Sequence, residues 1–185
     1  MESADRMIST HGLKGRKRIV AQRVLWVNAD LYTPWSRIAG GRLLIGPNGT
    51  IEAVGSEDSE ALRTDGRTDI EVKDAGGRML LPGFVDVHVH GGGGHDGMEG
   101  GQALAGMSRY HAEFGTTSFV PTVVCAARDK MIRTIEQWRA VMEGGRAEEM
   151  GAEAVGIHIE GPFLNPLRGG AQNRAHLRAP DVEEM

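Results

Sequence analysis

The 185-residue chain carries 21 basic and 25 acidic side chains, and its net charge of −4 argues against a general nucleic-acid binder, which is normally basic. Hydrophobic residues make up 40% of the chain, which is typical of a globular protein, but no apolar run approaches the ~20 residues of a transmembrane helix. The single cysteine, Cys125, excludes a disulfide within the chain. We therefore expect a cytoplasmic protein with no membrane or nucleic-acid partner.

The first 80 residues predict a short leader followed by a small β unit. Residues 1–18 are polar with a basic cluster, and we expect them to be disordered. A strand is expected over residues 19–27, and residues 43–54 predict a hairpin around the turn Pro47-Asn48-Gly49. Residues 19–80 should thus form a small antiparallel β domain.

After residue 80 the pattern changes to strands that alternate with helices. Apolar stripes predict helices over residues 101–114 and 129–142, and β-branched runs predict strands that end near residues 90, 124 and 160. Such alternation with short links is typical of an α/β fold with a parallel sheet and right-handed crossovers. Three parallel strands cannot close an eight-stranded barrel, which needs ~250 residues.

Two of these expected strands end in side chains that bind metals. His88 and His90 alternate with valines and so lie on one face of their strand, together with Asp86. Glu160 ends a second strand just before Gly161, and a buried carboxylate at that position is costly unless it is paired or bound to a cation. A lone His-x-His pair is as often an ordinary polar pair as a metal site, and the second strand end favours the metal site. Cys125 fits a small buried hydrophobic residue better than a nucleophile, because it has no evident activating partner.

Several motifs in one order resemble the amidohydrolase superfamily, and within it the N-acetylglucosamine-6-phosphate deacetylases. They are PGFVDVHVHG at 82–91, GTT at 115–117, PT at 121–122 and HIEGPFL at 158–164, followed by RGGAQ at 168–172 and LRAPD at 177–181. The first motif is shared widely in the superfamily, whereas the fourth is much more specific. The resemblance runs from about residue 19 to residue 185 and corresponds to roughly the N-terminal half of a member.

The resemblance implies a metal-dependent hydrolase that converts N-acetylglucosamine 6-phosphate to glucosamine 6-phosphate and acetate. It implies a (β/α)8 TIM-like barrel, of which residues 81–185 would form about the first three units, and a small β-sandwich, to which residues 19–80 would contribute. Glu160, His88 and His90 would bind one or two divalent ions, with zinc favoured over iron or manganese.

This chain differs from the family pattern at one position, and other functional residues of the family would lie outside it. Gln172 occupies a position where many members have a histidine that contacts the sugar, and we expect Gln172 and the adjacent Asn173 to bind substrate. The remaining histidine ligands and the aspartate that acts as general acid and base would lie beyond residue 185, so no catalytic residue is assigned here. Members are typically homodimers.

Two alternatives remain open from the sequence. One is another amidohydrolase, such as a cyclic-amide hydrolase, for which a lysine at the end of the fourth strand would be the discriminating feature. The other is a non-catalytic fragment that acts only with a partner chain, because an open three-stranded sheet exposes an edge and apolar surface. In the leading interpretation, we expect the isolated 185-residue chain to lack deacetylase activity.

Overall fold

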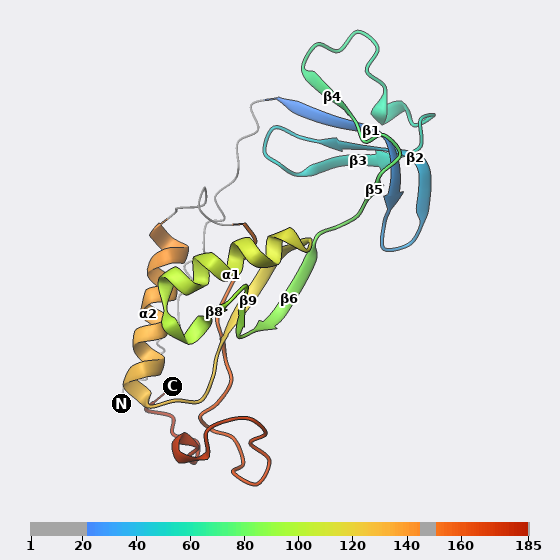
Figure 1. Ribbon diagram of the computed structural model, residues 1–185. Coiled ribbons are helices and arrows are strands. Elements are labelled where there is room, and N and C mark those ends of the chain that lie inside the picture. The colour runs from blue at the N-terminus through green and yellow to red at the C-terminus, as the bar shows by residue number, and fades with distance from the viewer. Residues whose placement is uncertain (1–21, 145–150, 185) are drawn as a thin grey trace, which may run out of the picture. The chain divides into compact units, whose positions relative to one another are not determined.

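The computed structural model describes residues 22–144 and 151–184. The chain divides into two compact units, Met1–Pro82 and Gly83–Met185 (Figure 1). The predicted leader at residues 1–18 lies outside the described residues. None of the helices in the described ranges is long and apolar enough to cross a membrane.

The described part of the first unit forms one five-stranded sheet with strand order β3-β2-β1-β4, and β5 also pairs with β1. Its elements are β1 (Arg23–Tyr32), β2 (Arg37–Ile45), β3 (Ile51–Gly55), the 3₁₀ helix η1 (Glu60–Leu62), β4 (Ile70–Asp74) and β5 (Met79–Leu80). The predicted hairpin is present as β2 and β3, which pair antiparallel on either side of the expected turn. Leu25, Leu44 and Leu62 form the core beneath it.

The expectation of a purely antiparallel β unit is wrong. β4 and β5 both run parallel to β1, with Arg23 opposite Ile70 at the start of the β1–β4 pair. The polar connection through η1 is long enough to carry the chain back to the beginning of β1, so that it enters the sheet in the same direction. A tight hairpin turn would instead have forced the antiparallel arrangement.

The second unit is a parallel sheet with two helices, as the alternating pattern predicts. Its elements are β6 (Phe84–Val89), β7 (Gly91–Gly92), β8 (His95–Asp96), the 3₁₀ helix η2 (Gly97–Glu99), α1 (Gly101–Glu113), β9 (Thr116–Val123), α2 (Arg128–Gly144), β10 (Glu153–Ala154), β11 (His158–Ile159) and the 3₁₀ helix η4 (Arg174–His176). β9 is central, and β6, β10 and β11 all pair with it in parallel. The mixed α/β fold class is therefore confirmed.

The third predicted strand is split into β10 and β11. Ala154 pairs with Phe119 and His158 pairs with Thr122, so residues 155–157 face a short stretch of β9 that contains Pro121. Because proline has no backbone N–H, the hydrogen-bond ladder has one donor fewer at this point. Pairing resumes two residues before Glu160.

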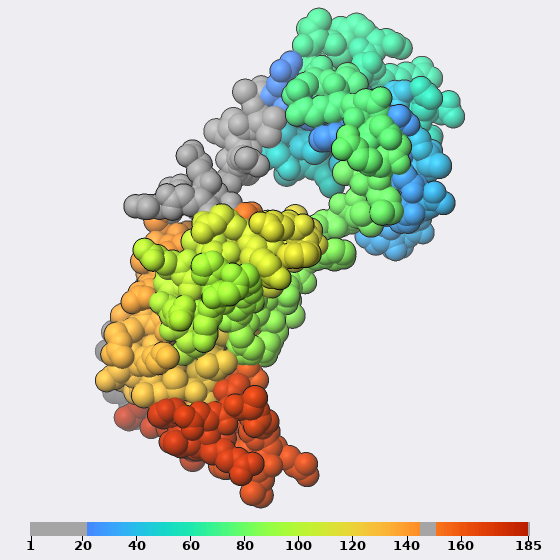
Figure 2. Space-filling model, in the orientation of Figure 1, coloured from blue at the N-terminus to red at the C-terminus, as the bar shows by residue number. Residues whose placement is uncertain are grey.

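Both helices cover the same face of this sheet (Figure 1). Val89, Phe119 and Val123 point from the strands into a core that Leu104 and Met107 of α1 and Met131 and Trp138 of α2 complete. The two helices also contact each other, and their atoms lie side by side in Figure 2. Since side chains alternate along a strand, the neighbours of these core residues project from the opposite face, and that face carries the candidate site.

Candidate metal centre

The end of β6 places two imidazoles on the face of the sheet opposite the helices. Val89 is 4% exposed in the core, so His88 and His90 on either side of it project the other way. The strand end is held in place by backbone contacts, because the amide of Gly97 donates to the carbonyl of His90 at 2.8 Å. His111 of α1 adds a second tie through its Nε2, which lies 3.0 Å from the carbonyl oxygen of Gly91.

The glycines after His90 allow this tight packing. A Cβ atom at Gly92 would lie 2.7 Å from His111 Nε2 and 2.8 Å from the ring of Tyr110. Gly93 and Gly94 have φ angles of +60° and +84°, a region that residues with a side chain rarely adopt. The chain can therefore turn immediately after the second histidine.

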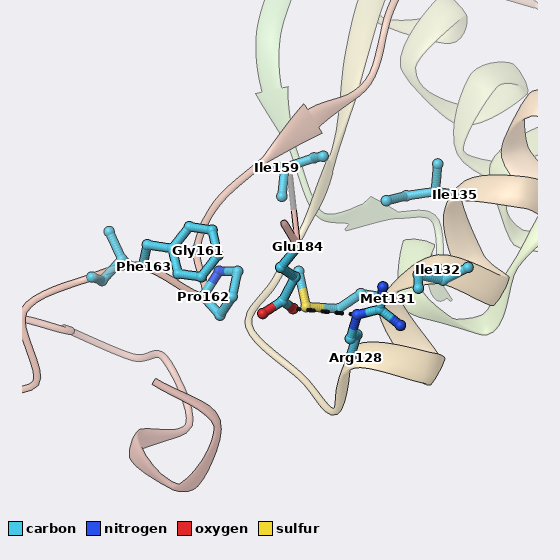
Figure 3. Close-up of a pocket in the computed structure, with 10 residues that line it drawn as sticks. Arg128, Met131, Ile132, Ile135, Ile159, Gly161, Pro162, Phe163 and Glu184 are labelled. Atoms are coloured by element: carbon cyan, nitrogen blue, oxygen red, sulfur yellow. Dashed lines mark ion pairs between the residues drawn. The ribbon is translucent and has the colours of Figure 1, made fainter. Parts of the chain in front are cut away.

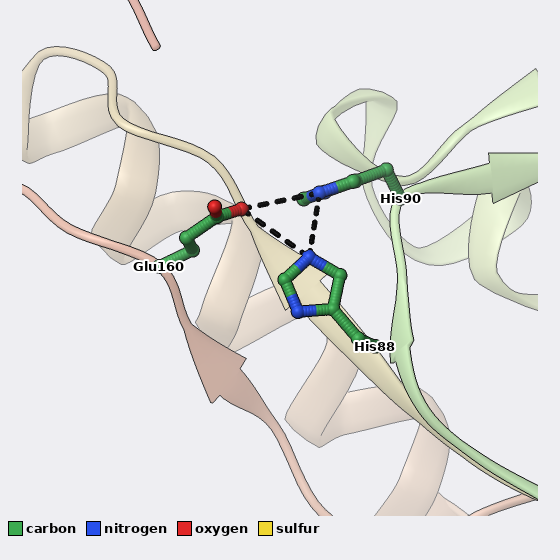
Figure 4. Close-up of side chains that lie close together, drawn as sticks. All are labelled: His88, His90 and Glu160. Carbon is green, nitrogen blue, oxygen red and sulfur yellow. Dashed lines mark hydrogen bonds and ion pairs between the residues drawn. The ribbon is translucent and has the colours of Figure 1, made fainter. Parts of the chain in front are cut away.

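Glu160 follows β11 and lies beside the two histidines of β6. β11 pairs with β9 through His158 and Ile159, and the amide of Glu160 donates to the carbonyl of Val123 at 3.0 Å. This bond fixes the residue at the C-terminal end of β9, where its carboxylate reaches across to the histidines of β6 (Figure 4).

The three ligand atoms form a small triangle. Nε2 of His88 lies 3.0 Å from Nε2 of His90, and Glu160 Oε2 lies 3.3 Å and 3.2 Å from these two nitrogens. A zinc ion with bonds of about 2.0–2.1 Å spaces its ligand atoms about 3.3–3.4 Å apart at tetrahedral angles and about 2.8–3.0 Å apart at right angles. The observed triangle falls within these limits, so the donors already have the spacing of a metal-binding set.

The carboxylate oxygen that belongs to this triangle has no hydrogen-bond partner. Oε2 of Glu160 is buried, and although both imidazole nitrogens are within ion-pair distance, no hydrogen bond reaches it. A buried, unsatisfied carboxylate oxygen is unfavourable, and a cation among the three donors would remove that cost. Two nitrogens and one oxygen are also donors that zinc binds well. The residues present therefore fit a divalent metal ion.

The neighbours of the triangle set the hydrogen-bonding state of one imidazole. His90 Nδ1 lies 3.2 Å from the carbonyl oxygen of Thr122, which can only accept, so Nδ1 carries a proton, and in the tautomer with one proton Nε2 keeps its lone pair. Asp86, which shares the histidine face, accepts the backbone amide of His88 at 3.1 Å and is not part of the triangle.

His158 is a residue near the group that the sequence did not single out. Its ring lies edge-to-face with that of His88, with centroids 4.9 Å apart, and its Nδ1 is 3.4 Å from the hydroxyl of Thr122. The alternation of residues 158 and 160 along one strand is the signal that could have found it, because both must share the face of Glu160.

The two residues predicted to bind substrate make contacts within the chain. Gln172 Oε1 accepts the backbone amide of Cys125 at 2.7 Å, which leaves its NH₂ group as the free end of the side chain. Asn173 Oδ1 accepts the amide of Ala175 at 3.0 Å and so caps η4. Cys125 itself is 4% exposed, and burial raises the pKa of its thiol, which suits a structural residue.

A cavity of about 360 Å³ lies on the other side of the Glu160 segment (Figure 3). Its walls are mainly apolar side chains of α2 and of residues 159–164, with an Arg128–Glu184 ion pair of 3.9 Å among them. Arg178 pairs with the same carboxylate and lowers the pKa of Glu184. Glu160 does not line this cavity, so the candidate chemistry belongs to the triangle.

Comparison with known proteins agrees with the motifs. No family model matches the chain. The chain is 38% identical over 117 residues to the N-acetylglucosamine-6-phosphate deacetylase of Bacillus subtilis, an alignment that covers 61% of this chain and 29% of the relative. The human enzyme of the same name is also 38% identical over 117 residues, covering 61% of this chain and 28% of that protein. The chain is related to the N-acetylglucosamine-6-phosphate deacetylases.

The structures of such deacetylases have the same fold over most of this chain. The deacetylase from Pasteurella multocida superposes with a TM-score of 0.71 at 26% identity, covering 87% of this chain and 40% of that one. The resemblance inferred from the motifs is thus confirmed. The chain spans less than a third of the curated deacetylases and about two fifths of this solved structure, which is less than the expected half.

Proposed function

We propose that this chain provides the first metal-binding part of a hydrolase that removes the acetyl group from N-acetylglucosamine 6-phosphate. The observation that carries the proposal is the triangle of His88, His90 and Glu160, one corner of which is an unsatisfied carboxylate oxygen, in a chain related to deacetylases. The products would be glucosamine 6-phosphate and acetate.

Within this proposal, the three side chains hold one divalent ion, and zinc suits their nitrogen and oxygen donors best. Iron or manganese and a second ion are alternatives that the same donor types allow. When bound, the ion would polarise the amide carbonyl and lower the pKa of a water molecule. A carboxylate at Glu160 would offset part of the charge of the ion, and His90 would offer its Nε2 lone pair because Nδ1 donates to the carbonyl of Thr122.

The remaining parts of the proposal follow from the arrangement of the second unit. A parallel order β6-β9-β11 with both helices on one face supports the first three units of a (β/α)8 barrel over residues 81–185, with residues 19–80 contributing to a small β-sandwich. In such barrels the site lies at the C-terminal ends of the strands, where His90 and Glu160 are found. Gln172 and Asn173 would contact the sugar, the general acid and base would be an aspartate beyond residue 185, and the protein would act as a cytoplasmic homodimer.

The test measures acetate and glucosamine 6-phosphate released from N-acetylglucosamine 6-phosphate in the presence of Zn²⁺. It compares the 185-residue chain with the product of the uninterrupted reading frame that contains it, each as wild type, Glu160→Gln and His95→Ala. His95 is exposed and outside the triangle, so it is a matched control for a change to a nearby polar side chain.

We expect turnover by the longer product, loss with Glu160→Gln and retention with His95→Ala, while the 185-residue chain alone is inactive. Hydrolysis of a cyclic amide in place of the acetamido sugar would favour the alternative amidohydrolase. Turnover by the 185-residue chain that His90→Ala abolishes would contradict the proposal that its catalytic machinery is incomplete.

A further inference from the structure

Thr122 lies on β9 between the two strand ends that supply the metal triangle. It is 1% exposed, and its partner in the β9–β11 ladder is His158. On the other side of β9, the neighbouring Pro121 pairs with Val89, the residue between the two histidines of β6. Thr122 therefore lies where β9 passes between the two histidine-bearing strands, and the proposed function assigns no role to its hydroxyl.

On the β6 side, Thr122 replaces part of the normal backbone ladder. The β6–β9 register shifts between Asp86 and Val89, so regular pairing is interrupted next to the first histidine, His88. The backbone amide of Val89 donates to Thr122 Oγ1 at 3.1 Å, and the Thr122 carbonyl accepts from His90 Nδ1 at 3.2 Å. The first bond fixes the peptide plane that joins His88 to Val89, and the second fixes the ring of His90.

On the β11 side, the hydroxyl meets a third histidine. Thr122 Oγ1 lies 3.2 Å from the carbonyl of Val120 and 3.4 Å from Nδ1 of His158. A hydroxyl has one proton to donate and two lone pairs that accept. Because the Val120 carbonyl can only accept, the hydroxyl donates to it and accepts from Val89 and from His158. This assignment uses the full capacity of the hydroxyl and puts the proton of His158 on Nδ1.

We propose that Thr122 is a positioning residue that sets the orientation and the tautomer of His90 and His158, so that both imidazoles carry their lone pair on Nε2. The inference rests on the proposed metal site for its consequence, because a ligand imidazole must present an unprotonated nitrogen to the ion. Its structural content, the tautomers, stands on the geometry of β6, β9 and β11 alone.

The first test compares Zn²⁺ affinity, measured by calorimetry, among variants of the whole chain. Thr122→Val keeps the shape of the side chain and removes the hydroxyl, whereas Thr122→Ser keeps the hydroxyl. Thr134 is the matched control. It is also a buried threonine, 4% exposed, but its hydroxyl donates to the Lys130 carbonyl within α2 and contacts none of the triangle residues.

Thr122→Val keeps the backbone carbonyl that accepts from His90 and removes the hydroxyl that accepts from the Val89 amide and from His158. Because the peptide between His88 and Val89 then loses its bond to β9, we expect Thr122→Val to weaken Zn²⁺ binding roughly 10–100-fold, as other changes next to metal ligands do, and Thr122→Ser to bind like the wild type. The visible spectrum of the Co²⁺-loaded chain should change with Thr122→Val and not with Thr134→Val. A folded Thr122→Val chain that binds Zn²⁺ like the wild type would overturn the proposal.

The second test needs no variant and no metal. Long-range ¹H–¹⁵N correlation spectra of the metal-free wild-type chain distinguish the two neutral tautomers from the doubly protonated ring and so report which nitrogen of each ring carries the proton. We expect Nδ1–H for both His90 and His158, and Nε2–H at either would overturn the assignment even if Thr122→Val fails to fold. Nδ1–H at both rings together with no Zn²⁺ binding by the wild type would instead refute the proposed metal site and leave the tautomer assignment intact.

Discussion

Trp138 links the core of the second unit to the strand end that carries His90, through hydrogen bonds at Gly97. Trp138 is fully buried in α2, and its Nε1–H donates to the carbonyl of Gly97 at 3.1 Å. The amide of the same Gly97 donates to the carbonyl of His90 at 2.8 Å. We expect the replacement Trp138→Phe to destabilise the second unit by about 2 kcal/mol.

The magnitude follows from two losses. The carbonyl of Gly97 keeps a hydrogen bond from the amide of Gly100 at 3.0 Å, so the lost indole bond costs only about 1 kcal/mol, the usual net value for a bond whose acceptor is not left orphaned. The missing edge of the larger ring leaves a gap in the core that adds about 1 kcal/mol. Trp138→Ala would cost more, about 3–5 kcal/mol, because the whole side chain is removed.

The assay is urea unfolding followed through the amide NMR signals of Phe119 and Val123, which report on the second unit. Trp35→Phe is the control, since Trp35 is 90% exposed and its change should stay within about 0.5 kcal/mol. A Trp138→Phe chain whose midpoint equals that of the control would refute the packing argument.

Three further predictions concern the remaining parts of the chain. Burial raises the pKa of the Cys125 thiol, so Cys125 should react with iodoacetamide at neutral pH far more slowly in the folded chain than in urea. Equal rates would contradict its burial. The backbone amide of Gly76 donates a hydrogen bond to Asp74 and lowers the pKa of its carboxyl group. The carboxylate therefore stabilises the fold at pH values above its ordinary pKa of about 3.9, and this effect is lost as the pH falls through the lowered pKa. Stability curves of wild type and Asp74→Asn should therefore converge in acid, and parallel curves would disprove the linkage. Gly92→Ala, which drives a methyl group against the His111 ring, should lower the free energy of unfolding by about 1–3 kcal/mol, whereas Gly144→Ala, with open space around it, should not.

The order of elements and the convergence of the candidate ligands could be predicted from the sequence, and for a physical reason. Alternation of apolar and polar residues along a strand fixes which face each side chain takes, and parallel strands bring their carboxyl ends together. The positions of His88, His90 and Glu160 follow from these two rules and from the two glycine-containing breaks that end the strands. The metal-binding role itself stays a prediction.

Features that depend on pairing between distant segments could not be predicted in the same way. The parallel entry of β4 depends on how the connection through η1 returns to β1, and local sequence does not record that path. The split of the third strand reflects Pro121 in a neighbouring strand. Thr122 bonds two histidines only because of the β6–β9–β11 register, so a single threonine in an apolar run gave no signal of this role.

The proposal that His88, His90 and Glu160 bind a divalent ion is tested most directly by Zn²⁺ affinity, measured by calorimetry at one pH for the wild-type chain and for Glu160→Gln and His95→Ala. Glu160→Gln keeps the size of the side chain and removes the charge that faces the two imidazoles, while His95→Ala removes an exposed imidazole outside the triangle. We expect Zn²⁺ to bind the wild type and the His95→Ala variant alike and to bind Glu160→Gln much more weakly. An equal loss of affinity in both variants, or no change in Glu160→Gln, would contradict it.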